Sequence, residues 1–135
     1  MKKKIQILYI VILTSASVSF AQAKKTVWSE MKTFHSFMSS TFHPAEEGNL
    51  APLRAKADSL LITAKLWQAS PIDESFKPKE TNATLKKLVK QCGTINNAVK
   101  KNASDKKLTL LITQAHDIFH TIVGECRKVE EDMPK

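Results

Sequence analysis

Side chains able to bind a metal ion recur at helical spacing in two parts of the sequence. Met31, His35 and Met38 follow one another at steps of four and three residues, and His116 and His120 stand four apart. Residues three or four positions apart share one face of a helix, so each set can point at a common ligand. Imidazole nitrogens suit zinc and copper, and a thioether sulfur suits copper(I). Both sets are therefore candidate ligand groups, although the same spacing is also that of an apolar stripe in a helical core.

Two of the histidines also have simpler interpretations. His35 falls on an apolar stripe, where a buried neutral imidazole must find partners for both ring nitrogens. A hydrogen-bonded core histidine and a metal ligand are both compatible with that position. His43 is followed by Pro44 and precedes Glu46 and Glu47, which favours a place at the surface, near a helix end.

Four stretches carry the apolar periodicity of amphipathic helices, and strand signals are nearly absent. Pro44 is expected to end the first helix and Thr81 or Asn82 to begin the third, while the fourth is expected to be the longest. The connection at 70–80 is long, and the other two are short. The predicted stripes are Trp28, Met31, His35, Met38 and Phe42; Leu53, Ala57, Leu60, Ala64 and Trp67; Leu85, Leu88, Cys92, Ile95 and Val99; and Leu108, Ile112, Ala115, Phe119, Ile122, Cys126 and Val129. Such a chain is all-α and packs as an up-down-up-down antiparallel four-helix bundle.

This topology allows the ligand candidates to be placed by depth. If the connections at 43–48 and 102–104 lie at one end, each helical residue lies about 1.5 Å per position below that end. Met31 and His116 are then both twelve residues deep, on helices that are antiparallel neighbours. His35 comes within roughly 6 Å of the same layer. We therefore expect Met31 and His116 to face each other between the first and last helices.

The two cysteines are predicted to be free. Cys126 lies about twelve positions deeper than Cys92, roughly 18 Å along the bundle axis, which is outside disulfide reach. Both stand on predicted apolar stripes, so we expect largely buried thiols that pack as small apolar core residues.

Residues 1–23 have the pattern of a secretory signal peptide. Three lysines precede the apolar run 5–13, and Ala21-Gln22-Ala23 forms an A-x-A cleavage site. The run is short for a membrane span, although an uncleaved anchor is the alternative. The remaining 112 residues suit a single domain, 24–135, in the periplasm or outside the cell. No second apolar run of this kind follows, so no membrane span is expected after signal cleavage.

The charge of this mature part is +5, from 18 basic and 13 acidic residues once the three signal lysines are removed. The lysines are spread along the helices without an aromatic-studded basic stripe, so nucleic-acid binding is not expected. An enzyme is not expected either, because the inward stripes contain no E-x-x-H motif of the kind that di-iron bundles use.

Three segments resemble the exported four-helix cytochromes, the family of cytochrome c-prime and the soluble b-type bundles. The segment 29–34, SEMKTF, is similar to the one in which b-type members place an axial methionine. The segment 57–64, followed by Ser70-Pro71, is similar to the alanine-spaced helix before a proline-containing loop. The segment 115–120, AHDIFH, is similar to the one that contains the axial histidine.

Within this family, the haem of this chain would be bound non-covalently. The covalent attachment motif C-x-x-C-H is absent, because Ile112 and Ala115 stand where its cysteines would be. The resemblance implies haem b with Met31 and His116 as axial ligands, an arrangement that favours electron transfer. It also implies a redox partner in the periplasm.

Two other functions remain open. In a metal-binding version, His35, His116 and His120 bind copper or zinc directly. Met31 or Met38 is then a soft ligand, and the protein handles metal together with a delivery partner. In a cofactor-free version the histidines are only packed or solvated, and the bundle is a periplasmic binding or scaffold protein.

Overall fold

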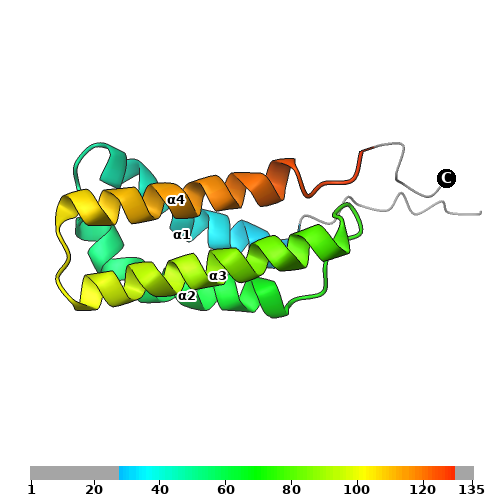
Figure 1. The fold of residues 1–135 in the computed structure, drawn as a ribbon, viewed down its shortest axis with the longest axis horizontal. Coiled ribbons are helices and arrows are strands. Elements are labelled where there is room, and N and C mark those ends of the chain that lie inside the picture. Colours follow the sequence, from blue (N-terminus) through cyan, green and yellow to red (C-terminus); the bar gives the residue numbers. More distant parts are fainter. Residues whose placement is uncertain (1–27, 130–135) are drawn as a thin grey trace, which may run out of the picture.

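The structure is a computed structural model, and it describes residues 28–129. In this range the chain forms four helices and no β-strand, in the order α1 (Ser29–Glu46), α2 (Ala51–Ala69), α3 (Pro78–Lys100) and α4 (Asp105–Gly124). Consecutive helices run antiparallel, and α1 also packs against α4, which closes the bundle (Figure 1). The predicted up-down-up-down four-helix bundle is confirmed.

Two expectations concern membranes. The predicted signal peptide at 1–23, with its cleavage site, lies outside the described residues. Among the helices of residues 28–129, none combines the length and the apolar character that crossing a membrane requires.

The stripes predicted for the second and fourth helices form the core. All members of these stripes within α2 and α4 are buried. Phe34 of α1 packs against Trp67 of α2 and Phe119 of α4. Trp67 is fully enclosed, with ring centroids 5.5 Å from Phe34 and 6.0 Å from Phe119. Burying such large rings removes much apolar area from water, which stabilises the bundle. The third stripe is buried too, except for Val99, which is half-buried.

The buried face of α1 differs from the predicted stripe at His35. Phe34 is fully buried and His35 is exposed, so the expected core position of His35 is wrong. Neighbouring residues are about 100° apart around a helix, so only one of these two rings can face the core. Phenylalanine is the one buried because its burial leaves no polar group without a partner. The buried residues of α1 are Phe34, Met38, Thr41, Phe42 and Ala45.

Two helix ends lie elsewhere than predicted. α1 continues through Pro44 to Glu46, because a proline this close to the end of a helix removes only one hydrogen bond. Gly48, with φ +84°, follows that end in the left-handed conformation that glycine adopts without strain. α3 begins at Pro78, earlier than the predicted Thr81, since proline is favourable in the first turn of a helix.

The fourth helix is shorter than predicted. α4 ends at Gly124, so Cys126 and Val129 lie beyond it, and α3 is the longest helix described, with 23 residues against 20. The chain after α4 pairs with the loop before α3, where the N–H of Lys77 donates to the carbonyl of Cys126 at 2.8 Å. Cys126 is consequently buried, whereas Val129 is exposed.

Arg54 and Ser104 hold the start of α4. The Nη2 atom of Arg54 donates to the carbonyl of Ala103 at 2.8 Å and to Oδ1 of Asp105 at 2.7 Å. Ser104 is the N-cap residue, and its Oγ accepts a hydrogen bond from the N–H of Lys107 at 3.2 Å. These contacts tie the beginning of α4 to α2.

We expect Leu60→Ala to lower the free energy of unfolding by about 2–5 kcal/mol, because Leu60 is fully buried and its truncation leaves a cavity. The matched control is Leu66→Ala on the same helix. Its side chain is 58% exposed, so its truncation should change stability by less than about 0.5 kcal/mol. Urea unfolding followed by circular dichroism measures both variants. Equal losses would contradict this assignment of the buried face of α2.

Candidate metal site on the α1–α4 face

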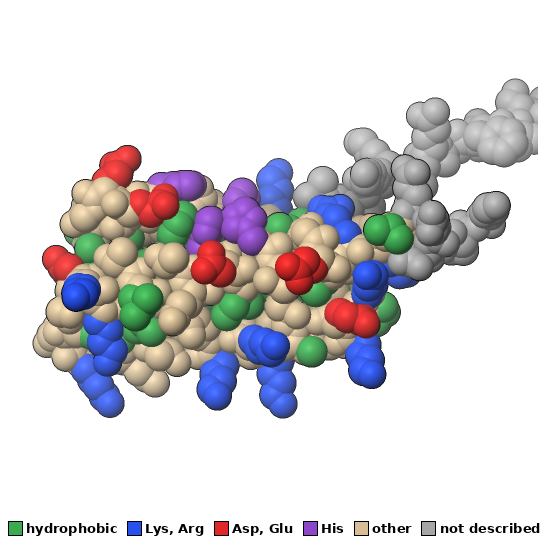
Figure 2. Space-filling view, turned by 45° about the horizontal axis from the view of Figure 1, so that its top comes forward, with side chains coloured by type: hydrophobic (Ala, Val, Ile, Leu, Met, Phe, Trp, Pro, Cys, Tyr) green, Lys and Arg blue, Asp and Glu red, His purple; other side chains and the backbone are tan. Residues whose placement is uncertain are grey.

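Two histidines of α4 bring their ring nitrogens together. His116 and His120 lie one turn apart, and their Nε2 atoms are 3.1 Å from each other. The two rings are nearly perpendicular, with an interplanar angle of 81°. His116 is half-buried and His120 is exposed, so the pair lies at the edge of the bundle. Figure 2 shows histidine side chains gathered on one face of the described bundle.

His116 is held in place by α1. Its ring stacks on Phe42, with centroids 3.7 Å apart and planes 12° from parallel. Burial lowers the pKa of His116 below the ordinary value of 6.5, and His120 lowers it further, against smaller opposing effects of two nearby carboxylates. The ring is therefore neutral at neutral pH and keeps a lone pair for a metal ion.

The separation of the two nitrogens matches that of two ligands on one ion. Zinc–imidazole bonds are about 2.0–2.1 Å long, and two such bonds with nitrogens 3.1 Å apart enclose an angle of about 98°. That angle lies between the tetrahedral and square-planar values. Without a metal, the same distance is that of a hydrogen bond in which one ring donates and the other accepts. To bind a metal, the ring that donates this hydrogen bond must shift its proton from Nε2 to Nδ1, so that both Nε2 lone pairs are free.

His35 does not take part in the ring contact of this pair, although it borders the same groove as His120. Its ring is exposed and stacks on Phe119, with centroids 5.1 Å apart and planes 4° from parallel. Both rings border a groove of about 350 Å³ between α1 and α4. The groove is lined by Met31, Lys32, His35, Phe119, His120 and Val123. His120 thus borders the groove, whereas His116 does not.

The expected pairing of Met31 with His116 is wrong. His116 contacts Phe42, which lies eleven residues beyond Met31, or about 16 Å along α1. The prediction took the ends of the helices as level. In the structure, Phe42 is four residues before the end of α1, while His116 is eleven residues after the start of α4. The beginning of α4 meets Arg54 of α2.

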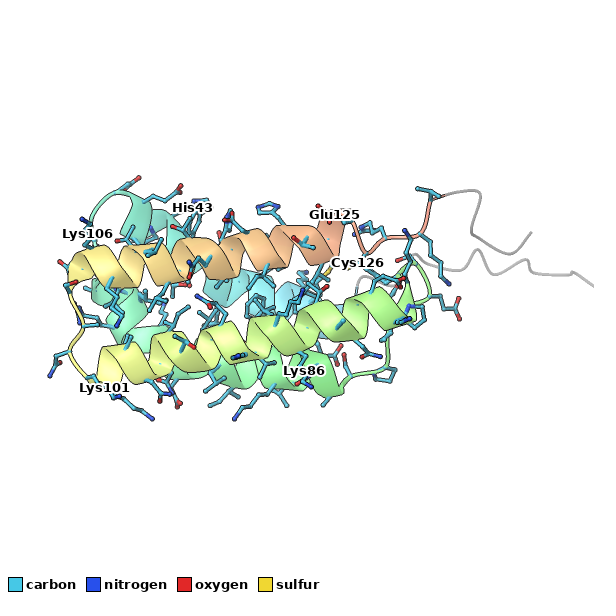
Figure 3. The ribbon with its side chains drawn as sticks, in the orientation of Figure 1. His43, Lys86, Lys101, Lys106, Glu125 and Cys126 are labelled. Atoms are coloured by element: carbon cyan, nitrogen blue, oxygen red, sulfur yellow. The ribbon has the colours of Figure 1, made fainter. Side chains whose placement is uncertain are left out.

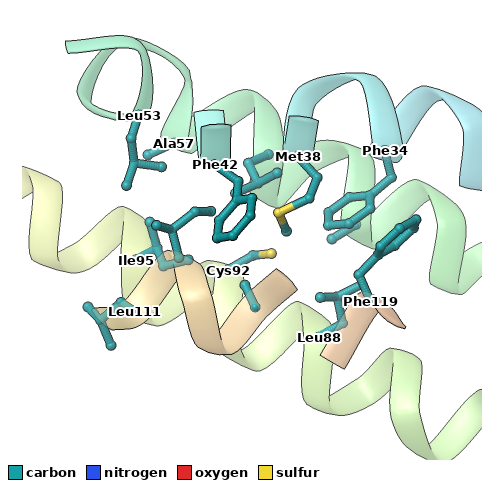
Figure 4. Packing of buried hydrophobic residues seen from close by; sticks show 14 of the residues in the cluster. Phe34, Met38, Phe42, Leu53, Ala57, Leu88, Cys92, Ile95, Leu111 and Phe119 are labelled. Carbon is teal, nitrogen blue, oxygen red and sulfur yellow. The ribbon is translucent and has the colours of Figure 1, made fainter. Parts of the chain in front are cut away.

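These positions do not fit a haem held by Met31 and His116. Two axial ligands bind one iron from opposite sides, whereas these two residues are offset by about 16 Å along α1. Between the helices, Phe34, Met38 and Phe119 are buried and occupy the space that a porphyrin would need (Figure 4). The described residues do not form a haem pocket of this kind.

The metal set predicted from the sequence is assembled only in part. His116 and His120 meet, but the described residues contain no group of three or more His, Cys, Asp or Glu side chains that could hold a metal ion. In the metal-free arrangement, no third side chain of this kind among the described residues, His35 included, completes a group with the pair. Met38 is fully buried and its sulfur points toward Cys92 (Figure 4), so it is directed into the core and away from the exposed His120.

His43 and Glu46 form a second polar pair, which the sequence prediction did not include in the site. Nδ1 of His43 lies 3.2 Å from Oε2 of Glu46, and the two side chains are 63% and 53% exposed. His43 stands near the end of α1 (Figure 3), and its ring centroid is 5.4 Å from that of Phe42, the ring that stacks on His116. The i, i+3 spacing was visible in the sequence. The position of His43 relative to α4 was not visible, because it depends on how α1 and α4 are aligned along each other.

The two cysteines are free and buried, as predicted. Cys92 lies in the core, where burial raises the pKa of its thiol to about 12. Cys126 follows α4, and its Sγ lies 3.7 Å from Oγ1 of Thr84. Neither thiol belongs to the histidine pair, so both are packing residues.

Comparison with known proteins adds no relative. The chain matches no family model, no curated protein and no solved structure. The resemblance to the helical cytochromes stays a prediction, and the functional argument depends on the geometry of the described residues.

We expect the metal-free protein to lose more stability than His116→Gln as the pH falls below 6.5. The fold lowers the pKa of His116 from that value, so the unfolded chain takes up the proton first. The stability that the neutral ring contributes is complete above the unfolded pKa and is lost as the pH falls toward the lower, folded pKa. Urea unfolding between about pH 8 and about pH 5, with a chelator present, measures this difference. Parallel pH profiles would contradict the lowered pKa.

The cysteines should react with a thiol reagent only when the protein unfolds. Cys92 is fully buried with a pKa of about 12, so almost none of it is thiolate, and Cys126 is 3% exposed. Spectrophotometric titration with Ellman's reagent is expected to give little reaction in buffer and two thiols per chain in denaturant. A count of zero in denaturant would indicate a disulfide and contradict the structure.

Proposed function

We propose that the protein binds a divalent transition-metal ion, zinc or copper, through His116 and His120, and that it handles this metal in the periplasm or outside the cell. The observation that carries the proposal is the 3.1 Å separation of the two Nε2 atoms. Two imidazole nitrogens at this distance suit both metals in bond length and angle. The location follows from the signal-peptide pattern of residues 1–23.

The neutral state of His116 supports this proposal. A histidine must be deprotonated to bind a metal, and the lowered pKa of His116 means that little proton competition arises at neutral pH. Stacking on Phe42 also restricts the rotation of the His116 ring, so less conformational entropy is lost on binding. His120 is exposed and gives the ion access from solvent.

The number of ligands favours metal handling over a structural metal. Structural zinc sites are closed by four protein ligands, whereas sites with fewer keep positions open for water or another molecule. A two-histidine site at the edge of the bundle would exchange its ion readily, as binding and delivery to a partner require. The core is already filled by apolar side chains, so the ion is not needed to complete the fold.

We expect Zn²⁺ or Cu²⁺ to raise the melting temperature of the purified protein, because the ion binds only the folded state. At a free metal concentration of about 100 times Kd, the gain is about 2.7 kcal/mol. His116→Ala and His120→Ala should each weaken binding at least about tenfold, since a single imidazole cannot chelate the ion. Calorimetric titration and thermal unfolding measure both effects.

The matched control is His35→Ala, which removes an exposed histidine that stacks on Phe119, outside the ring contact of His116 with His120. It should bind metal with the affinity of the parent chain. Binding that survives in the double variant His116→Ala/His120→Ala would refute the proposal. The bundle would then bind metal elsewhere. A parent chain that binds no Zn²⁺ or Cu²⁺ would also refute the proposal and would leave the cofactor-free scaffold.

A further inference from the structure

The two-histidine pair leaves an ion with unfilled positions, and α1 carries an unused imidazole, that of His43, whose ring lies against the same Phe42 ring as His116. Zinc and copper sites in proteins usually take three or four ligands. The rings of His43 and His116 both lie against Phe42, at centroid distances of 5.4 and 3.7 Å. The packing of α1 on α4 thus brings a histidine of each helix to one aromatic ring.

The hydrogen bond to Glu46 prepares His43 as a ligand. An ionised carboxylate only accepts, so Nδ1 of His43 must carry the proton in the 3.2 Å contact with Oε2 of Glu46. The other ring nitrogen, Nε2, then has a free lone pair. A carboxylate behind the remote nitrogen is the usual second-shell arrangement of a metal-binding histidine, because it sets the tautomer and makes the ligand more basic.

His43 is free to move to the pair. Its side chain is 63% exposed, so turning the ring toward His116 does not break core packing. In the metal-free arrangement the described residues bring no three such ligands together, so His43 must turn when the ion binds. Glu46 is 53% exposed, so its carboxylate can follow the ring, and the movement involves two exposed side chains near the end of α1.

A metal ion bound by residues of both α1 and α4 would strengthen the contact between these two helices. This contact is the smallest of the four contacts between neighbouring helices, and no connecting loop joins these two helices directly. A ligand from α1 on an ion held by α4 would close this side of the bundle. Binding of the ion would then stabilise the position of α1 against α4.

We propose that His43, oriented by Glu46, is the third protein ligand of the ion, so that the metal links the end of α1 to α4. This inference rests on the proposed function of His116 and His120. It makes Glu46 a positioning residue that acts through His43. One coordination position stays open to water or to an exchanging ligand, as in zinc sites with three protein ligands.

The test is a calorimetric Zn²⁺ titration of the full mature chain and three variants. His43→Ala should weaken binding by at least about tenfold, and Glu46→Ala by about 10–100-fold, because second-shell partners of metal-binding histidines have effects of this size. His35→Ala is the matched control, an exposed histidine of the same helix without a carboxylate partner, and should stay within about twofold of the parent. Circular dichroism checks that each variant is folded.

Nitrogen NMR of the histidine rings gives a readout that a merely structural role would not change. Zn²⁺ should shift the Nε2 signals of His43, His116 and His120, and Glu46→Ala should remove the preference of metal-free His43 for the Nδ1–H tautomer. Unchanged affinity in His43→Ala, with binding lost in His116→Ala, would overturn this inference and leave the two-histidine site standing. If Glu46→Ala weakened Zn²⁺ binding and His43→Ala did not, the carboxylate itself would be the ligand. That result would also overturn the inference that His43 is the third ligand. Binding that survives removal of both His116 and His120 would overturn the proposed function itself.

Discussion

The contact between α1 and α4 decides where every candidate ligand lies. These helices are the first and the last of the bundle, so no short connection aligns them, and their register depends on side-chain packing alone. Two aromatic contacts set it, Phe34 against Phe119 and Phe42 against His116, at centroid distances of 5.9 and 3.7 Å. A shift by two turns would exchange all the partners across this face.

The same packing explains why the histidines lie at the edge of the bundle and not in its core. On α1, Phe34 and His35 compete for one inward position, and the phenylalanine is buried because it has no polar atoms to satisfy. On α4, Phe119 is buried, while His116 beside it remains half-exposed. The polar rings are therefore left at the rim of the bundle, where they are exposed or half-exposed to solvent.

A site at this rim differs from the cofactor sites usually built into helical bundles. Those sites replace part of the core with side chains that point inward at the cofactor. Here the core is complete with Trp67, Met38 and their neighbours, and a ligand at the histidine pair would add to a finished fold. Binding of such a ligand could then be weak or strong without deciding whether the chain folds.

Much of the fold could be predicted because the information is local. The apolar residues of α2 and α4 recur at helical spacing, and each predicted member within those helices is buried. The spacing of His116 and His120 likewise predicted that they share a face, since four residues make about one turn. Helix ends were less predictable. Cys126 leaves α4 to pair with the loop before α3, a contact between parts of the chain that are distant in sequence.

The sequence by itself determined four amphipathic helices, their order, two free cysteines and one histidine pair, because each follows from periodicity along a single helix or from chain connectivity. Only the tertiary structure decided that His116 meets Phe42 and not Met31, and that His43 and His116 contact the same aromatic ring. The physical reason is that the sliding of one helix along another is set by how the side chains of both fit together. Spacing within either helix says nothing about that fit.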